Sequence, residues 1–252
     1  MAHSPEQGVR YSQGNKDIGA ARNFSWEFAV PQNKFWDDLP YTAGRNFLSL
    51  FEPGEQPSLD DDDNADSNAL SRPDKLRLLL KLLRERLARK DADAAPRSFY
   101  DVDYQAWDKT WLAIAGIQHE LRDFAAEEQT LRMLIERRKD SSNLSHLHSL
   151  SGLLLEKGAY EEAERTETVV RDWLDSKLGR ESPQSLGARR MIAQAVWMQG
   201  RRAEGERLMA EVGAIIDETA EDSPYAVYRD QQREMTKELM EKLRAEGRTA
   251  EK

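Results

Sequence analysis

The chain has 252 residues, of which 39% are hydrophobic and 33% charged, and its formal net charge at pH 7 is -9. The absence of cysteine excludes disulfides, thiolate metal sites and cysteine nucleophiles. The sequence shows no secretory signal, no run of roughly 20 apolar residues and no basic stripe, so we expect a cytoplasmic protein that binds neither membrane nor nucleic acid.

Residues 1–70 differ in character from the rest of the chain. They hold five of the nine prolines and carry 12 acidic against 5 basic residues. We expect part of this arm to pack on the folded body in an extended form, and residues 52–70, with the acidic run 60–63, to form a linker. The arm also has large apolar side chains, which disordered segments usually lack: Phe24, Trp26, Phe28, Phe35, Trp36, Phe47, Leu48 and Phe51.

A helix is predicted over residues 74–90. Ser71, Pro73 and Asp74 form a favourable helix start, and leucines then recur at helical spacing at positions 76, 79, 80, 83 and 87. The segment 91–97 should end this helix. After Phe99 the chain consists of predicted helices joined by short polar turns, and strand-favouring residues are scarce, so the expected fold class is all-α.

A pattern repeats in the second half of the chain. Residues 158–164, GAYEEAE, align with residues 200–206, GRRAEGE, at a shift of 42 residues. A third copy lies 36 residues upstream, where Arg122 stands at the position of the turn glycine and Phe124 at that of Tyr160. A glycine in the left-handed conformation closes a helix, and a small residue lets two helices approach closely. We therefore predict three helical hairpins: 99–121 with 124–139, 143–157 with 160–178, and 184–199 with 201–219.

This pattern resembles the tetratricopeptide repeat (TPR), whose signature includes a turn glycine, an aromatic residue and an alanine. The spacing of 42 residues and the connection LGRESP at 178–183 are similar to the kinesin-light-chain type of repeat. The resemblance implies a right-handed solenoid of helical hairpins, with repeats at about 99–139, 143–178 and 184–219. The expected organisation is an N-terminal arm, 1–70, and a solenoid, 71–252, which ends in a capping helix over 224–245.

The resemblance also implies a binding surface, because the first helix of each repeat lines a concave groove in this family. Such a groove could hold a peptide segment of a protein partner through main-chain hydrogen bonds and an aromatic anchor. Its basic side chains favour an acidic partner. For Trp197 the alternative is packing against the C-terminal helix. Matching the repeats residue by residue gives these groove candidates: Lys109, His119, His148, Arg190, Gln194 and Trp197.

No catalytic residue, cofactor or metal site is predicted. His146 and His148 are two residues apart, about 200° around a helix axis, so they cannot ligate one metal ion from one face. His119 and His148, with a nearby glutamate, could form a general acid/base pair. This leaves the question of an enzyme open, although no known catalytic motif accompanies the two histidines.

The sequence favours a protein-interaction module, and two alternatives stay open. Trp26, Trp36 and Phe47 of the arm could close one side of the solenoid into an apolar pocket, as in an enzyme or a small-molecule binder. The arm could instead fill the groove of its own chain, or dock on a second copy to give a homodimer or a scaffold subunit.

Overall fold

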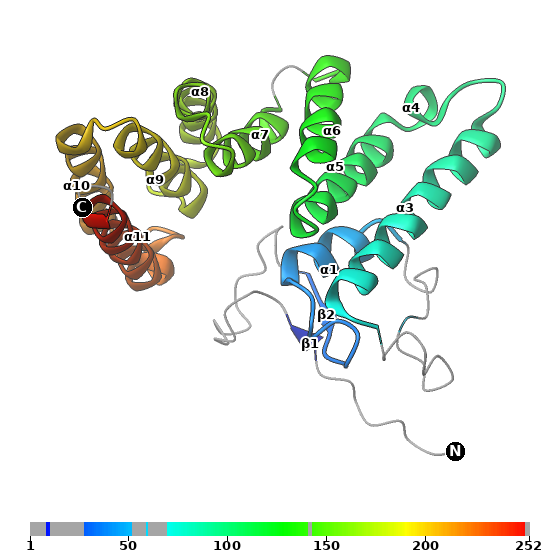
Figure 1. Ribbon diagram of the computed structural model, residues 1–252, viewed down its shortest axis with the longest axis horizontal. Helices are drawn as coiled ribbons and strands as arrows, with labels where there is room; N and C mark the ends of the chain where they lie inside the picture. The colour runs from blue at the N-terminus through cyan, green and yellow to red at the C-terminus, as the bar shows by residue number, and fades with distance from the viewer. Residues whose placement is uncertain (1–8, 11–27, 52–58, 60–69, 141–142, 250–252) are drawn as a thin grey trace. The chain divides into compact units, whose positions relative to one another are not determined.

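The computed structural model of the chain describes residues 9–10, 28–51, 59, 70–140 and 143–249 (Figure 1). The chain divides into two compact units, residues 1–136 (unit 1) and 137–252 (unit 2). The predicted division at residue 70 rests on composition and stays a prediction. In the described ranges, no helix is both long and apolar enough to cross a membrane.

Unit 1 contains a short antiparallel pairing of two strands, with Val9 opposite Pro31, and a group of helices. Its elements are β1 (Val9–Arg10), β2 (Val30–Pro31), α1 (Tyr41–Leu48), α3 (Arg72–Ala94), α4 (Phe99–Val102), α5 (Tyr104–Glu120) and α6 (Phe124–Arg137). Unit 2 is built of helices, and its elements are α7 (Ser145–Glu156), α8 (Tyr160–Leu178), α9 (Pro183–Met198), α10 (Arg202–Glu218), the 3-10 turn η2 (Ala226–Tyr228) and α11 (Arg229–Thr249).

Helix α3 begins at Arg72, two residues before its predicted bound of 74, and its N-cap is Ser71 of the predicted start signal. The Ser71 hydroxyl accepts a hydrogen bond from the Asp74 N–H (3.4 Å) and donates one to the Asp74 carboxylate (2.5 Å). The leucines at 76, 79 and 83 are at most 1% exposed. The helix runs to Ala94, which is past residue 90 but within the segment 91–97 that was expected to end it. No helix breaker precedes Pro96, and alanine favours continuation.

The described part of the arm belongs to the core of unit 1. Phe35, Trp36 and Phe47 are 0–2% exposed, and the ring centroids of consecutive pairs lie 5.0 and 5.9 Å apart. These rings pack with leucines of α3 and with Trp107 and Ile114 of α5. Phe24, Trp26 and most of the segment 52–70 lie outside the described residues, so the linker prediction is not addressed there.

The prediction that the arm is extended is wrong for Tyr41–Leu48, which forms α1. A glycine makes the close packing of this helix feasible, since a Cβ on Gly44 would lie 2.9 Å from Cγ1 of Val30. An eight-residue helix is too short to be stable alone. Tertiary packing therefore stabilises α1.

A buried lysine of α3 binds the arm. Lys75 is 0% exposed, and its ammonium group donates to the Lys34 carbonyl (2.6 Å) and pairs with the Asp38 carboxylate. The same nitrogen lies 5.4 Å from the centroid of the Phe35 ring. The hydrogen bond and the positive charge of Lys75 hold the pKa of the Asp38 carboxyl below its usual 3.8.

The three hairpins turn in the same way. Arg122, Gly158 and Gly200 have φ angles of 57°, 78° and 84°, and they lie 36 and 42 residues apart. In each turn, the residue after the one with positive φ donates its N–H to the carbonyl five residues before it. This hydrogen bond closes the preceding helix. These bonds are Asp123 to Gln118 (2.9 Å), Ala159 to Leu154 (2.9 Å) and Arg201 to Val196 (3.3 Å). The turn pattern predicted from the sequence is confirmed.

The small-residue position of the repeat also has its expected role. Ala163 is 1% exposed between α7 and α8. At the matching position of α10, a Cβ on Gly205 would lie 3.1 Å from the Cβ of Trp197. In the first hairpin the position is Glu127, which is 4% exposed and hydrogen-bonded to His119 of α5. A specific polar contact replaces the small side chain there.

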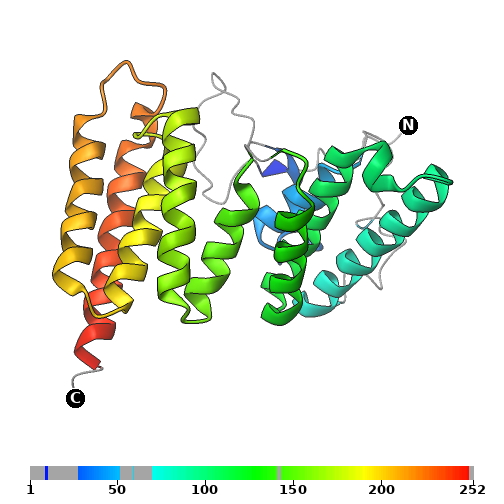
Figure 2. The ribbon, with the colours of Figure 1, turned by 90° about the horizontal axis from the view of Figure 1, so that it is seen from above.

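Helices α8 to α11 pack one on the next within unit 2, as Figure 2 shows. Helix α8 ends at Leu178 and is capped by Gly179, which has a φ of 88°, and α9 begins at Pro183 after the N-cap Ser182. The Arg189 guanidinium of α9 binds the Asp175 carboxylate of α8 through two hydrogen bonds of 2.8 and 2.6 Å. The LG-x-x-x-P connection thus ends one hairpin and starts the next.

Helix α11 covers α9 and α10, and it begins at Arg229 instead of residue 224. The Ser223 hydroxyl accepts a hydrogen bond from the Tyr225 N–H (3.2 Å), which makes a turn of the segment expected to open the helix. Tyr228 of η2 is then buried, and Leu243 near the other end of α11 is 1% exposed.

Candidate functional site

The two candidates in unit 1 lie on α5. Lys109 is exposed. His119 is 36% exposed by side chain, and its Nδ1 lies 3.1 Å from the Oε2 of buried Glu127. One histidine nitrogen is therefore used within the hairpin.

His148, on α7, makes a similar contact with the second helix of its hairpin. Its Nδ1 lies 2.7 Å from Oε1 of Glu167 on α8, whose side chain is 1% exposed, whereas the His148 side chain is 43% exposed. Burial opposes protonation of the ring, but the hydrogen bond and charge of Glu167 outweigh it, so the His148 pKa lies above 6.5. Burial also raises the pKa of Glu167, despite the nearby imidazole. Both groups therefore keep a proton to a higher pH than usual, and the His148 ring stays partly exposed.

Arg190, on α9, is a buried cation. It is 6% exposed, and its NH1 donates to the Thr236 hydroxyl of α11 over a long 3.4 Å. Across the described part of the chain, no carboxylate pairs with Arg190. Burial lowers its pKa to about 10, so the guanidinium stays charged at neutral pH.

The remaining two candidates, Gln194 and Trp197, follow Arg190 at helical spacing on α9. Gln194 is half-buried, whereas Trp197 is 7% exposed and packs in a cluster with Met209 of α10 and Leu243 of α11. The alternative in which Trp197 packs against the C-terminal helix therefore describes the structure. His148 and Arg190 occupy matching repeat positions, but α11 covers Arg190.

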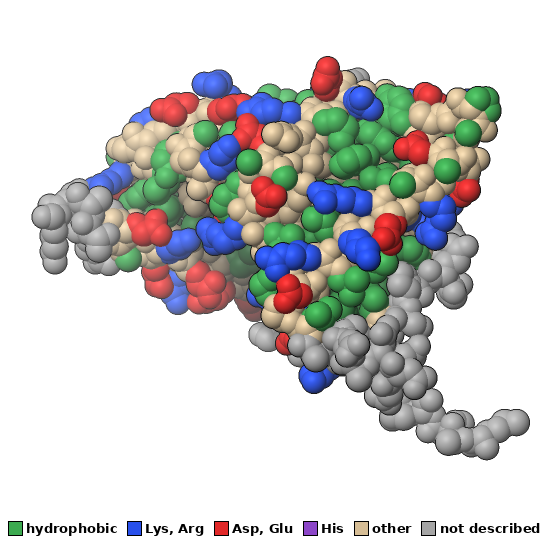
Figure 3. All heavy atoms as spheres, turned by 45° about the vertical axis from the view of Figure 1, so that its right-hand side comes forward, with side chains coloured by type: hydrophobic (Ala, Val, Ile, Leu, Met, Phe, Trp, Pro, Cys, Tyr) green, Lys and Arg blue, Asp and Glu red, His purple; other side chains and the backbone are tan. Residues whose placement is uncertain are grey.

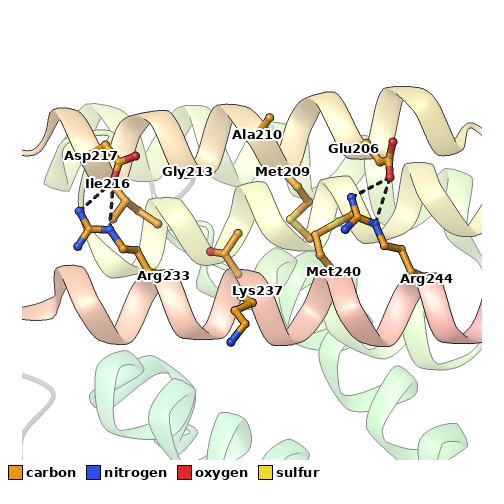
Figure 4. A pocket seen from close by; sticks show the side chains of 11 residues that line it. Glu206, Met209, Ala210, Gly213, Ile216, Asp217, Arg233, Lys237, Met240 and Arg244 are labelled. Carbon is orange, nitrogen blue, oxygen red and sulfur yellow. Dashed lines mark hydrogen bonds and ion pairs between the residues drawn. The ribbon is translucent and has the colours of Figure 1, made fainter.

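The structure adds a pocket that the sequence did not indicate (Figure 4). It has a volume of about 360 Å³ between α10 and α11. Its signal in the sequence is weak: a glycine, Gly213, inside an amphipathic helix, and methionines on both facing helices. The lining residues are Glu206, Met209, Ala210, Gly213, Ile216, Asp217, Arg233, Thr236, Lys237, Met240 and Arg244.

Two ion pairs lie at opposite ends of this pocket. Arg233 donates to Asp217 at 3.0 and 2.9 Å, and Arg244 donates to Glu206 at 3.2 and 3.0 Å. Between them the side chains of Met209 and Met240 point toward each other, as Figure 4 shows. A Cβ on Gly213 would meet no atom within 4 Å, so the helices are not in tight contact here.

Unit 1 has a surface hollow of about 430 Å³ along α3. Arg77, Leu80 and Arg84 are among the residues that line it. On the face in Figure 3, Lys and Arg side chains alternate with acidic and hydrophobic ones and do not gather in a single patch. This hollow has one helix as its wall and lacks a converging set of functional groups.

Neither a metal cluster nor the arm pocket is formed by the residues that the structure describes. Within these ranges, no three His, Asp or Glu side chains converge in a way that could hold a metal ion. The arm rings Trp36 and Phe47 fill the core of unit 1. His119 and His148, the suggested acid/base pair, each bind a glutamate of their own hairpin.

Comparison with solved structures agrees with the repeated turns. A crystal structure of a single-residue variant of a Podospora anserina protein, designated a kinesin light chain with nearly identical TPR-like repeats, aligns with a TM-score of 0.50 and 20% identity. The alignment covers 71% of this chain and 90% of that one. The chain has a TPR-like helical repeat fold.

A second crystal structure of the Podospora TPR-like repeats aligns with a TM-score of 0.49 and 20% identity, over 68% of this chain and 87% of that chain. No protein-family profile and no curated protein matches the sequence. At this identity the likeness concerns the TPR-like fold and says nothing of a ligand.

Proposed function

We propose that the protein is a protein-interaction module, and that it binds a peptide segment of a partner on the surface formed by α7 and α9. The observation that carries the proposal is the His148–Glu167 pair. A buried glutamate fixes the ring on the first helix of a TPR-like hairpin and leaves 43% of the histidine side chain exposed. A ring held in one orientation is a pre-organised hydrogen-bonding group, which lowers the entropic cost of binding.

We limit the proposed contacts to part of the candidate surface. Lys109 and His119 belong to unit 1, and α11 covers Arg190 and Trp197, so the proposed contacts in unit 2 are His148 and Gln194. A protonated His148 favours an acidic or carbonyl-rich peptide. A cytoplasmic location and a role as a scaffold stay predictions of this proposal.

A peptide-display selection on the purified full chain tests the proposal. Selected peptides should bind Gln194→Arg at least tenfold more weakly, because a long charged side chain would obstruct the surface. They should bind Val169→Arg unchanged, since Val169 is 53% exposed on α8, outside this surface. If no peptide is enriched, or if both variants lose affinity equally, the proposal is wrong.

A further inference from the structure

Arg190 is 6% exposed and pairs with no carboxylate among the described residues of unit 2. A buried charge normally has a partner of opposite sign, because removing an ion from water costs several kcal/mol. Arg189, one residue earlier, follows this rule through its two bonds to Asp175. Arg190 has a single long contact with a hydroxyl. Its surroundings are therefore suited to an anion.

Thr236 connects Arg190 to the pocket between α10 and α11. Its hydroxyl accepts the Arg190 hydrogen bond, donates to the Gln232 carbonyl (2.8 Å), and its side chain lines the pocket. The Arg190 guanidinium thus lies behind one wall of the pocket. The hydroxyl can turn to donate to a ligand oxygen while the guanidinium stays beside it.

A second polar group in this region is also unsatisfied. Gln232 lies one helical turn before Thr236 and is 5% exposed. Among the described atoms its Oε1 is buried and has no hydrogen-bond partner, and its Nε2 has a weak contact with the Met235 sulfur at 3.9 Å. Buried polar groups without partners are rare in native proteins. A half-turn of the amide would place an N–H donor at the position that Oε1 now occupies.

The charges and walls of the pocket define the ligand. Asp217 and Glu206 at its ends are already neutralised by Arg233 and Arg244. The positive charge of Arg190 is then uncompensated, whereas the lining between the ion pairs is mostly apolar apart from Thr236 and Lys237. A ligand that matches both features has an apolar stem and a negatively charged head.

We propose that the pocket between α10 and α11 binds a small aliphatic carboxylate, with its apolar stem against Met209, Ile216 and Met240 and its carboxylate at Thr236 and Arg190. The pocket lies between α10 and α11, whereas the proposed peptide contacts are His148 and Gln194, so this inference does not depend on the proposed peptide binding. A failed peptide selection leaves it intact, and its own failure leaves the peptide surface intact.

Octanoate is a suitable probe. Its binding to the full-length protein can be measured by NMR of the methionine methyl groups. Octanoate should shift the methyl signals of Met209 and Met240, and leave Met133 in the core of unit 1 unchanged. Acetate, which lacks the stem, and octanol, which lacks the charge, should each bind at least tenfold more weakly. Equal binding of octanol and octanoate, or no shift of Met209 and Met240, would overturn the proposal.

Two variants locate the two parts of the site. Arg190→Gln should fold, because it removes an uncompensated buried charge, and should weaken octanoate at least tenfold while octanol binding stays the same. Gly213→Leu should fill the pocket and abolish the binding of both probes, since the space at Gly213 is empty. If Arg190→Gln keeps full affinity for octanoate, the assignment of its guanidinium is wrong, even when the pocket itself binds.

Discussion

Arg122 has a φ angle of 57° at the position where the other two hairpins have glycine. The left-handed conformation costs a non-glycine residue roughly 1–2 kcal/mol. Its guanidinium lies 5.3 Å from the centroid of the Phe124 ring, and such a contact at an exposed site offsets about 0.5 kcal/mol. The first hairpin therefore has a residual strain that the second and third lack.

Replacing Arg122 with glycine should raise the free energy of unfolding by up to about 1 kcal/mol, because relief of strain exceeds the added entropy of the unfolded chain. Gly158→Ala, the reverse change at the matching turn, should lower it by about 1 kcal/mol. Urea denaturation monitored by circular dichroism measures both. A destabilised Arg122→Gly variant would show that the arginine makes a compensating contact.

The His148–Glu167 pair should make stability depend on pH. The His148 pKa lies above 6.5 in the folded protein, so its contribution is fully present below pH 6.5 and is lost as the pH rises through the raised folded pKa. The raised pKa of Glu167 acts in the same direction, because the folded state binds protons more tightly than the unfolded state. Unfolding free energy should therefore fall as the pH rises above 6.5.

The matched variant for this prediction is Glu167→Gln. Without the carboxylate, burial alone acts on the ring, so the NMR titration midpoint of His148 should drop below its value in the unchanged protein. The decline of stability with pH should become shallower. A titration midpoint that is the same in both proteins would mean that Glu167 does not hold the proton of His148.

At the scale of elements, the arm and α3 are joined through Lys75. Lys75→Met keeps an apolar stem but loses the bonds to Lys34 and Asp38, and a lost buried hydrogen bond costs about 1–3 kcal/mol. We expect faster hydrogen exchange in α1 and a lower melting temperature. Lys81→Met, on the exposed side of α3 at 70% side-chain exposure, is the control and should change neither. Equal exchange in both variants would contradict the anchoring role of Lys75.

The elements that the sequence predicted well are those with a repeated local signal. Turn residues at matching positions identified the three hairpins, because a left-handed residue and a close helix contact each require particular side chains. Helix α1 was missed because eight residues give little periodicity and its stability comes from distant partners. Lys75 had a visible signal, four residues before buried Leu79, but a lysine on an apolar stripe does not reveal its counter-ion.

The candidate site was predictable in part, because the repeat pattern identifies equivalent positions on different helices. Repeat matching found the positions of His148 and Arg190, yet burial depends on what packs above a position. Nothing in the pattern of α9 shows that α11 would cover Arg190 and Trp197. The α10–α11 pocket depends on the spacing between two helices, which a sequence periodicity does not encode.

At the scale of the whole molecule, each unit has a core of its own. The cluster that includes the arm rings lies entirely in unit 1, and the clusters around Leu144, Leu186 and Trp197 lie in unit 2. In helical repeat proteins, stability is approximately a sum of repeat and neighbour contributions, and a terminal helix with a polar outer face protects the end of the stack. Helix α11 has this role in unit 2.

Removing residues 220–252 should therefore expose one defined apolar surface. Ala193, Trp197 and Met209 would lose their contacts with Leu243, so the melting temperature should fall and a hydrophobic dye should bind. Hydrogen exchange should rise in α9 and α10, because their covering helix is gone, and stay unchanged in α3 and α5, whose core is in unit 1. An unchanged melting temperature without dye binding would show that α11 is not a structural cap. A loss of protection in α3 would show that the two cores unfold as one.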